Sequence, residues 1–155
     1  MDLYLVQHGE AMDERADPER GLTQKGKIEV ERTARFAKEA GIEHLEVFHS
    51  GKKRARETAE IMAWHLGAKI IASDGLSPLD DPWVWKERVD SVSNDIMLVG
   101  HLPHLKGLAG LLVAGDRDKD IIDFKMGGIV CLRRKDGRWR VAWAVTPEIV
   151  GEAEE

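Results

Sequence analysis

The sequence contains a single cysteine, Cys131, and no long uninterrupted apolar run. One cysteine can form neither an internal disulfide nor a cysteine-rich metal site, so a reducing compartment fits best. The longest apolar stretch is broken by histidine and lysine, which argues against a transmembrane helix. Residues 1–6 show no basic leader and no small-residue cleavage site. We therefore expect a cytoplasmic protein that does not associate with a membrane.

Excess positive charge is also lacking. The formal net charge of the 155 residues is -5, which gives no general electrostatic footprint for nucleic acid. Apolar residues make up 43% and charged residues 33% of the chain, which is typical of a folded domain and not of a disordered one. Repeats, linkers and low-complexity tracts are absent from the sequence. We expect one globular domain over residues 1–155, with no nucleic-acid partner.

Short apolar runs alternate with helically spaced patterns along the chain. After the first run, Thr23 is placed to cap a helix that Gly41 stops, and residues 135–137 form a hairpin turn. This alternation predicts an α/β fold, a mostly parallel sheet sandwiched by helices, with an antiparallel C-terminal hairpin at one edge. The predicted strands are 3–6, 45–48, 69–72, 96–99, 129–133 and 139–144, and the later helices are 53–66, 83–89 and 105–113.

Three of the predicted strand ends carry polar side chains that could perform chemistry. The first leads to His8, the second to Ser50 and onward to Arg54, and the fourth to His101. Ligands of such sheets bind outside the carboxyl ends of the strands, so these groups should converge. A guanidinium can fork onto phosphoryl oxygens while one imidazole attacks phosphorus. Positive neighbours would lower the pKa of that imidazole and keep it unprotonated.

Four short motifs occur in the same order along the chain as in a known protein family. They are Leu5–Glu10 around the first histidine, Leu22–Gly26, Ser50–Thr58 and Val99–His101. With these motifs the chain resembles the histidine phosphatase superfamily, also called the phosphoglycerate mutase-like fold, over nearly its whole length. The short length and His101-Leu102-Pro103 are most similar to the small phosphohistidine phosphatases of the SixA type.

The resemblance implies a role for each matched residue. His8 is the phosphoryl acceptor, Arg54 a phosphate clamp and His101 a second, charged hydrogen-bond donor. The family's motifs also imply a set of substrate-binding residues, namely Gln7, Gly9, Thr23, Ser50 and Arg54.

Gln7 departs from the family, whose signature has arginine at this position. An amide keeps a donor toward phosphate but loses a full charge and the two-pronged geometry of a guanidinium. Because of this departure, one alternative is a member of the family that is weakly active, or that binds phosphate without catalysis.

A general acid would come from the segment after the third predicted strand. Asp80 and Asp81 are the candidates there, although both also suit the turns made with the neighbouring prolines. Phosphohistidine has a nitrogen leaving group that is protonated readily, so its hydrolysis depends less on an acid. The spacing of His101 and His104 does not indicate a zinc site, because no cysteine or carboxylate lies nearby in the sequence.

These observations predict a phosphatase that needs no metal and no cofactor and acts through phosphohistidine on His8. The favoured substrate is phosphohistidine on a protein, because a short loop before the fourth strand would leave the mouth of the site open. The alternatives are the non-catalytic binder and a phosphomonoesterase acting on a phosphorylated small molecule.

Overall fold

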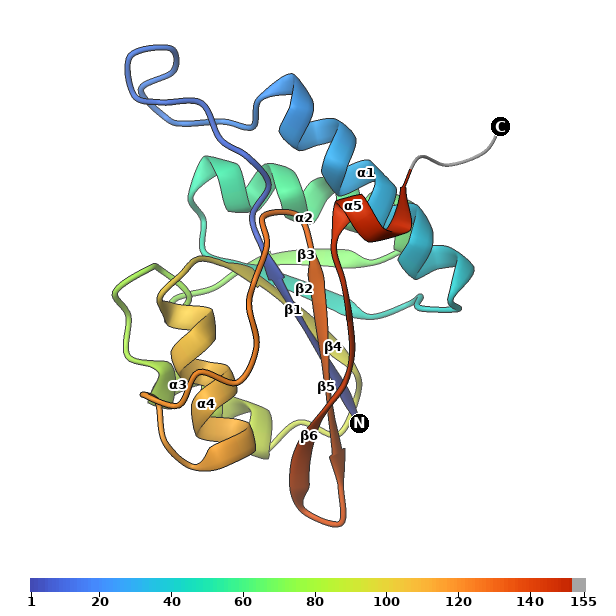
Figure 1. The fold of residues 1–155 in the computed structure, drawn as a ribbon, viewed down its shortest axis with the longest axis vertical. Helices are drawn as coiled ribbons and strands as arrows, with labels where there is room; N and C mark the ends of the chain where they lie inside the picture. The colour runs from blue at the N-terminus through green and yellow to red at the C-terminus, as the bar shows by residue number, and fades with distance from the viewer. Residues whose placement is uncertain (152–155) are drawn as a thin grey trace.

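The computed structural model describes residues 1–151, and within them six strands form one sheet in the order β3-β2-β4-β1-β5-β6. The first four strands run parallel, whereas β5 is antiparallel to both β1 and β6. This arrangement confirms the predicted parallel sheet with a C-terminal hairpin at one edge (Figure 1). The strands are β1 (Asp2–Gln7), β2 (Glu46–His49), β3 (Lys69–Ala72), β4 (Ile96–Gly100), β5 (Ile129–Lys135) and β6 (Arg138–Val145).

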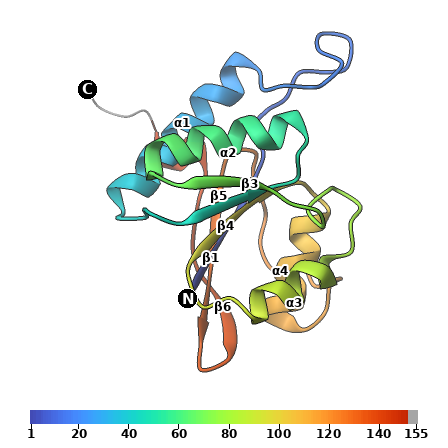
Figure 2. The same cartoon turned by 180° about the vertical axis from the view of Figure 1, so that it is seen from behind.

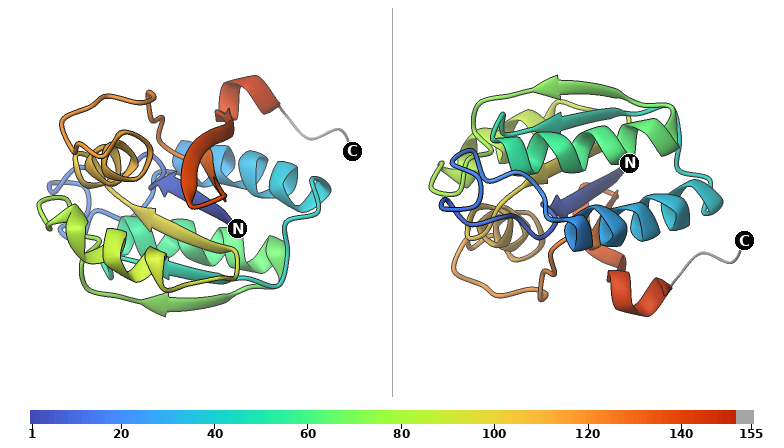
Figure 3. Two further views of the ribbon diagram at one scale, coloured as in Figure 1. Left: turned by 90° about the horizontal axis from the view of Figure 1, so that it is seen from below. Right: turned by 90° about the horizontal axis from the view of Figure 1, so that it is seen from above.

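Helices cover both faces of the sheet, as Figures 1 and 2 show from opposite sides. Two groups pack together, α1 with α2 and α5 on one face and α3 with α4 on the other, and the end-on views of Figure 3 separate them. The helices are α1 (Gln24–Glu39), α2 (Lys53–Leu66), α3 (Pro82–Asp90), α4 (His104–Ala114) and α5 (Pro147–Val150).

Strand β1 is the centre of this packing. Its side chains alternate between two buried clusters, with Tyr4 and Val6 against α1 and α2, and Leu3 and Leu5 against α3 and α4. Alternation of this kind is what a strand with helices on both faces requires. The strand is therefore held from both faces, and its carboxyl end is a rigid support for the residue that follows it.

The first helix shows where the sequence pattern succeeds and where it fails. Thr23 caps α1 as predicted, because its hydroxyl accepts a hydrogen bond from the Gly26 amide. Val30 lies in the buried face of the helix, but Ile28, two residues earlier in the same apolar pattern, is 45% exposed. Successive residues of a helix are about 100° apart, so Ile28 and Val30, which are two positions apart, lie about 200° apart and cannot share a face. The short helix α5 was not predicted.

Gly26 is required where α1 passes the chain that leaves β1. A methyl group at this position would overlap the carbonyl oxygen of Glu10. We expect Gly26→Ala to lower the free energy of unfolding by about 2–3 kcal/mol, because the crowding atom belongs to backbone that cannot rotate away. Urea unfolding measures this loss. Lys27→Ala, on the exposed side of the same turn, is the matched control and should change the free energy of unfolding little. Equal losses of that free energy in the two variants would contradict the steric account.

Within residues 1–151, no helix combines the length and the apolar character that crossing a membrane would need.

Candidate active site

The two histidines at the carboxyl ends of β1 and β4 face one another. Because β1 and β4 are neighbours, Gln7 lies beside Gly100, and the His8 amide donates to the Gly100 carbonyl at 3.0 Å. The ring centroids of His8 and His101 are 5.1 Å apart. The structure thus brings together two of the residues that the sequence placed at separate strand ends.

His8 is held in one tautomer by its own backbone. Its Nδ1 lies 2.7 Å from the Gly9 carbonyl oxygen, and since a carbonyl only accepts, Nδ1 must carry the proton. Nε2 then has the free lone pair. Burial is the main cause that lowers the pKa of His8 from its ordinary 6.5, with Arg54 and Arg20 acting in the same direction and the Gly9 bond opposing them. The ring is therefore prepared to act as a nucleophile near neutral pH.

This tautomer can be tested without any substrate. In an NMR titration of the imidazole signals, we expect His8 to titrate below pH 6.5, with Nδ1 protonated in the neutral form. A pKa for His8 above its ordinary 6.5, or a neutral ring protonated on Nε2, would contradict the assignment.

His101 is almost completely buried and is oriented by Ser50 from the end of β2. Its Nε2 lies 2.7 Å from the Ser50 hydroxyl oxygen, and among residues 1–151 its Nδ1 has no hydrogen-bond partner. Burial, with the nearby His8 and Arg54, lowers the pKa of His101 to about 3. The ring is neutral near pH 7 in these surroundings, so the charged donor implied by the family resemblance depends on the negative charge of a phosphoryl group.

Arg54 reaches the same place from the first turn of α2. Its Nε is buried and lacks a hydrogen-bond partner in the described part of the chain. The helix turn that carries it is tied to the first histidine through Thr58, whose hydroxyl donates to the Arg54 carbonyl and accepts from the Gly9 amide at 3.0 Å. A buried, unpartnered N–H is costly unless a ligand supplies an acceptor, and a phosphoryl oxygen is suited to that purpose.

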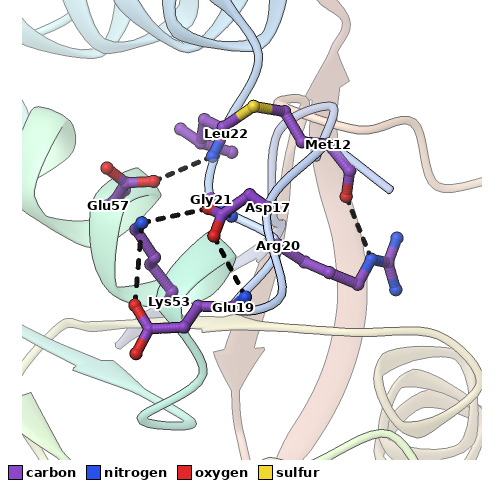
Figure 4. Close-up of polar contacts among 8 residues, drawn as sticks. All are labelled: Met12, Asp17, Glu19, Arg20, Gly21, Leu22, Lys53 and Glu57. Carbon is purple, nitrogen blue, oxygen red and sulfur yellow. Dashed lines mark hydrogen bonds and ion pairs between the residues drawn. The ribbon is translucent and has the colours of Figure 1, made fainter. Parts of the chain in front are cut away.

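Arg20 is a cation of this site that sequence reasoning missed. Its charge lowers the pKa values of both His8 and Arg54, although burial is the larger cause for each. Its backbone is in the left-handed region, with φ of 54°, and its Nε donates to the Met12 carbonyl (Figure 4). Nothing in the local sequence distinguishes Arg20 from Arg15 in the same charged loop.

The loop that carries Arg20 is fixed to the start of α2. Asp17 accepts from the amides of Glu19 and Gly21 and pairs with Lys53 at 3.0 Å, as drawn in Figure 4. Glu57, one helical turn further on, accepts from the Leu22 amide at 2.8 Å. The same helix therefore positions Arg54 directly and Arg20 indirectly.

Gln7 lies at the end of β1, directly before His8. Its Oε1 is buried and has no hydrogen-bond partner among the described residues, while its backbone carbonyl accepts from Gly127. The two ends of an amide are exchanged by a half turn, which would direct the NH2 group to the same place as a donor. Its position is consistent with the substrate-binding role predicted for it.

Gly9 and Thr23 have structural contacts of their own. The Gly9 amide is used by Thr58, and a methyl group on Gly9 would approach Val30 to 2.8 Å. Thr23 caps α1 and donates to the Glu10 carboxylate at 2.9 Å. Their predicted contact with substrate stays a prediction.

The two acid candidates lie in the turn before α3. Asp80 accepts from the Ser77 amide at 2.9 Å, and Asp81 caps α3 through the Trp83 amide and lies 3.7 Å from Arg117. Within residues 1–151, no hydrogen bond or ion pair joins either carboxylate to the paired histidines. Their role as a general acid therefore stays a prediction. The described residues also contain no group of three histidine, cysteine or carboxylate side chains that could hold a metal ion.

Sequence comparison finds related proteins. The model of the histidine phosphatase superfamily, branch 1, matches residues 3–80. A relative from Picosynechococcus sp., described only as an uncharacterised protein, is 33% identical over 141 residues, which cover 86% of this chain and 85% of that one. The probable phosphoglycerate mutase GpmB of Escherichia coli is 35% identical over 100 residues, or 61% of this chain but only 46% of GpmB.

Structural comparison gives similarity over longer stretches. The protein histidine phosphatase SixA, solved with tungstate, superposes with a TM-score of 0.84 at 22% identity and covers 97% of this chain and 100% of its own. The putative phosphohistidine phosphatase SixA from Agrobacterium tumefaciens gives a TM-score of 0.79, also at 22% identity, over 94% and 97% of the two chains. At this level of identity, the similarity establishes the fold.

Proposed function

Because the chain belongs to the histidine phosphatase superfamily, we propose that it is a phosphatase that removes phosphate from phosphohistidine on proteins. The observation that carries the proposal is the pairing of His8 and His101, 5.1 Å apart, beside the guanidinium of Arg54. Superfamily membership supports the phosphatase activity itself. The choice of a protein substrate goes further and rests on the arguments that follow.

The reaction has two displacements at phosphorus. The Nε2 lone pair of His8 forms a bond to phosphorus while the bond to the leaving nitrogen breaks, and that nitrogen takes up a proton. Water then attacks the phosphoryl group, releases inorganic phosphate and restores His8. Arg54, with Arg20 beside it, neutralises the charge on the transferring oxygens in both steps.

Size supports a protein-borne substrate. The chain covers all of the SixA chain, whose description names a protein histidine phosphatase, but less than half of GpmB. Only nine residues, 73–81, join β3 to α3, so the segment that could cover the mouth is short. A phosphoryl group attached to a folded partner needs an open mouth of this kind.

The test is to compare kcat/KM for a phosphohistidine peptide with kcat/KM for phosphorylated small molecules. A preference for the small molecules would favour the phosphomonoesterase alternative.

One further candidate is a weakly active enzyme, because the buried Oε1 of Gln7 has no hydrogen-bond partner among the described residues. If Gln7 limits the reaction, Gln7→Arg should raise kcat on a phosphohistidine peptide by about tenfold, which corresponds to about 1.4 kcal/mol of transition-state stabilisation. The reason is that a charge-assisted contact is about twice as strong as a neutral hydrogen bond.

Two measurements separate this effect from simple anion binding. The affinity for inorganic phosphate is measured alongside kcat, and the exposed Gln24→Arg provides the same change of charge away from the site. Tighter phosphate binding with unchanged or lower kcat would show that Gln7 does not limit catalysis.

A further inference from the structure

A cavity lies near the paired histidines, between the turn before α3 and the start of α4. It has a volume of about 220 Å³, and the residues that line it include Asp80, His104, Arg117 and Asp118. His104 follows His101 by three residues, so the cavity adjoins the proposed phosphoryl site. Figures 1 and 2 both show the segment before α3 next to the first turn of α4.

His104 is the feature that points to a ligand. It is only 2% exposed, and neither ring nitrogen makes a hydrogen bond to a described residue, although the Gly75 carbonyl is near enough to raise its pKa. Burial outweighs that contact and lowers the pKa of His104 to about 4. The ring is therefore neutral near pH 7 and can accept a hydrogen bond through one nitrogen. The Gly75 carbonyl can serve at most one ring nitrogen, so at least one other buried nitrogen is left without a partner, which is costly unless a ligand satisfies it.

Charge around the cavity complements a cation. Both basic residues in its lining are within 4 Å of a carboxylate, Lys106 of Asp120 at 3.6 Å and Arg117 of Asp81 at 3.7 Å. Asp80 and Asp118 also line it, and in residues 1–151 neither carboxylate is in an ion pair.

The wider surroundings show the same imbalance. Residues 80–81 and the loop 115–120 together carry five carboxylates. The same segments carry two basic residues, and Lys106 brings the number of basic residues to three. A region of negative charge thus adjoins the positive phosphoryl site.

We propose that this cavity binds a protonated amine or guanidinium group of the substrate that lies near its phosphoryl group. His104 accepts a hydrogen bond from the cation, and the carboxylates of Asp80 and Asp118 neutralise its charge. The inference rests on the proposed function and deepens it, because it selects substrates in which a positive nitrogen accompanies the phosphate. Such a group can belong to a lysine or arginine of a phosphoprotein, or to a small phosphorylated amine.

The experiment compares ligands that differ only in this cation. One set consists of phosphohistidine peptides with a single lysine at each position from three before to three after the phosphohistidine, and the same peptide with alanine throughout. The second set is 2-aminoethyl phosphate and propyl phosphate. Dissociation constants are measured by calorimetry on the His8→Ala protein, which cannot form the phosphoenzyme, and kcat/KM on the wild type. We expect lysine in at least one position to lower the dissociation constant and to raise kcat/KM, each by about tenfold relative to the alanine peptide.

Variants test whether the preference arises in the cavity. Asp118→Asn should reduce the tenfold preference to about threefold, because one of the neutralising charges is lost. Asp136→Asn, at the far tip of the β5–β6 hairpin, makes the same chemical change and should leave the preference intact. His104→Phe should reduce the preference further, and circular dichroism shows whether this buried substitution folds.

The outcomes discriminate between the two proposals. Preference for lysine in the peptides supports a phosphoprotein source of the cation, and preference only for 2-aminoethyl phosphate supports a small phosphorylated amine. Equal or undetectable affinities within both sets would overturn the inference about the cavity. A binding preference for the cation without hydrolysis of any ligand by the wild type would support the cavity and overturn the proposed function.

Discussion

His8→Ala is expected to abolish both turnover and the covalent phosphoenzyme. Nε2 of His8 is the only protein atom that bonds to phosphorus in this proposed mechanism, so its loss should reduce kcat by a factor of about 10⁴ or more. Wild-type protein quenched during turnover of a labelled phosphohistidine substrate should carry label that is stable to alkali and labile to acid, as a phosphoramidate is. Mapping of that label to a peptide identifies the nucleophile.

The control for this experiment is another histidine of the same chain. His44 is exposed and has a positive φ of 56°, which asparagine tolerates, so His44→Asn should retain both label and turnover. Label on His101 in place of His8, or full turnover by His8→Ala, would show that the roles of the two histidines have been assigned wrongly.

Arg54→Ala should weaken catalysis by a factor of about 10²–10³. Its buried Nε has no partner among the described residues, and its charge acts on both histidines, so a phosphoryl group would gain both a hydrogen bond and a charge from it. Inhibition by vanadate should weaken as well, since the guanidinium contacts ground and transition states alike. Arg54→Lys should restore only part of the loss, because a point charge cannot make two parallel hydrogen bonds.

Arg56→Ala is the matched control. It removes the same group two residues further along α2, where the side chain is exposed and pairs with Glu60. Vanadate inhibition and kcat should stay close to wild type in this variant. If Arg54→Ala leaves vanadate inhibition unaltered, Arg54 does not bind the phosphoryl group.

The sequence was sufficient to predict the fold because local and global signals agree in this chain. The bounds of α2 and β3 were predicted to the residue, since Gly67 both ends the helix in a left-handed conformation and separates it from the strand. The four residues of β1 that alternate between the two cores form a continuous apolar run, which is the expected signature of a strand covered on both faces.

The parts of the site that could not be predicted depend on long-range contacts. Arg20 reaches the site because Lys53 and Glu57 hold its loop from another element, and no local pattern records that contact. The neutral state of His101 has a similar origin, since its burial and its cationic neighbours arise only when the strand ends meet. The hydroxyl of Ser50 orients that ring, a contact that the family motif does not reveal.

The position of β1 in the middle of the sheet has a consequence for how the chain folds. Leu3 is paired with Ile96 on one side and with Leu132 on the other, so β1 finds its partners only after these later parts of the chain have been made. Contacts between such distant residues make folding slow, and until they form, both apolar faces of β1 are open to other chains. His8 follows β1 and meets His101 only when these long-range pairings form. We therefore expect newly made protein to need protection from aggregation until then.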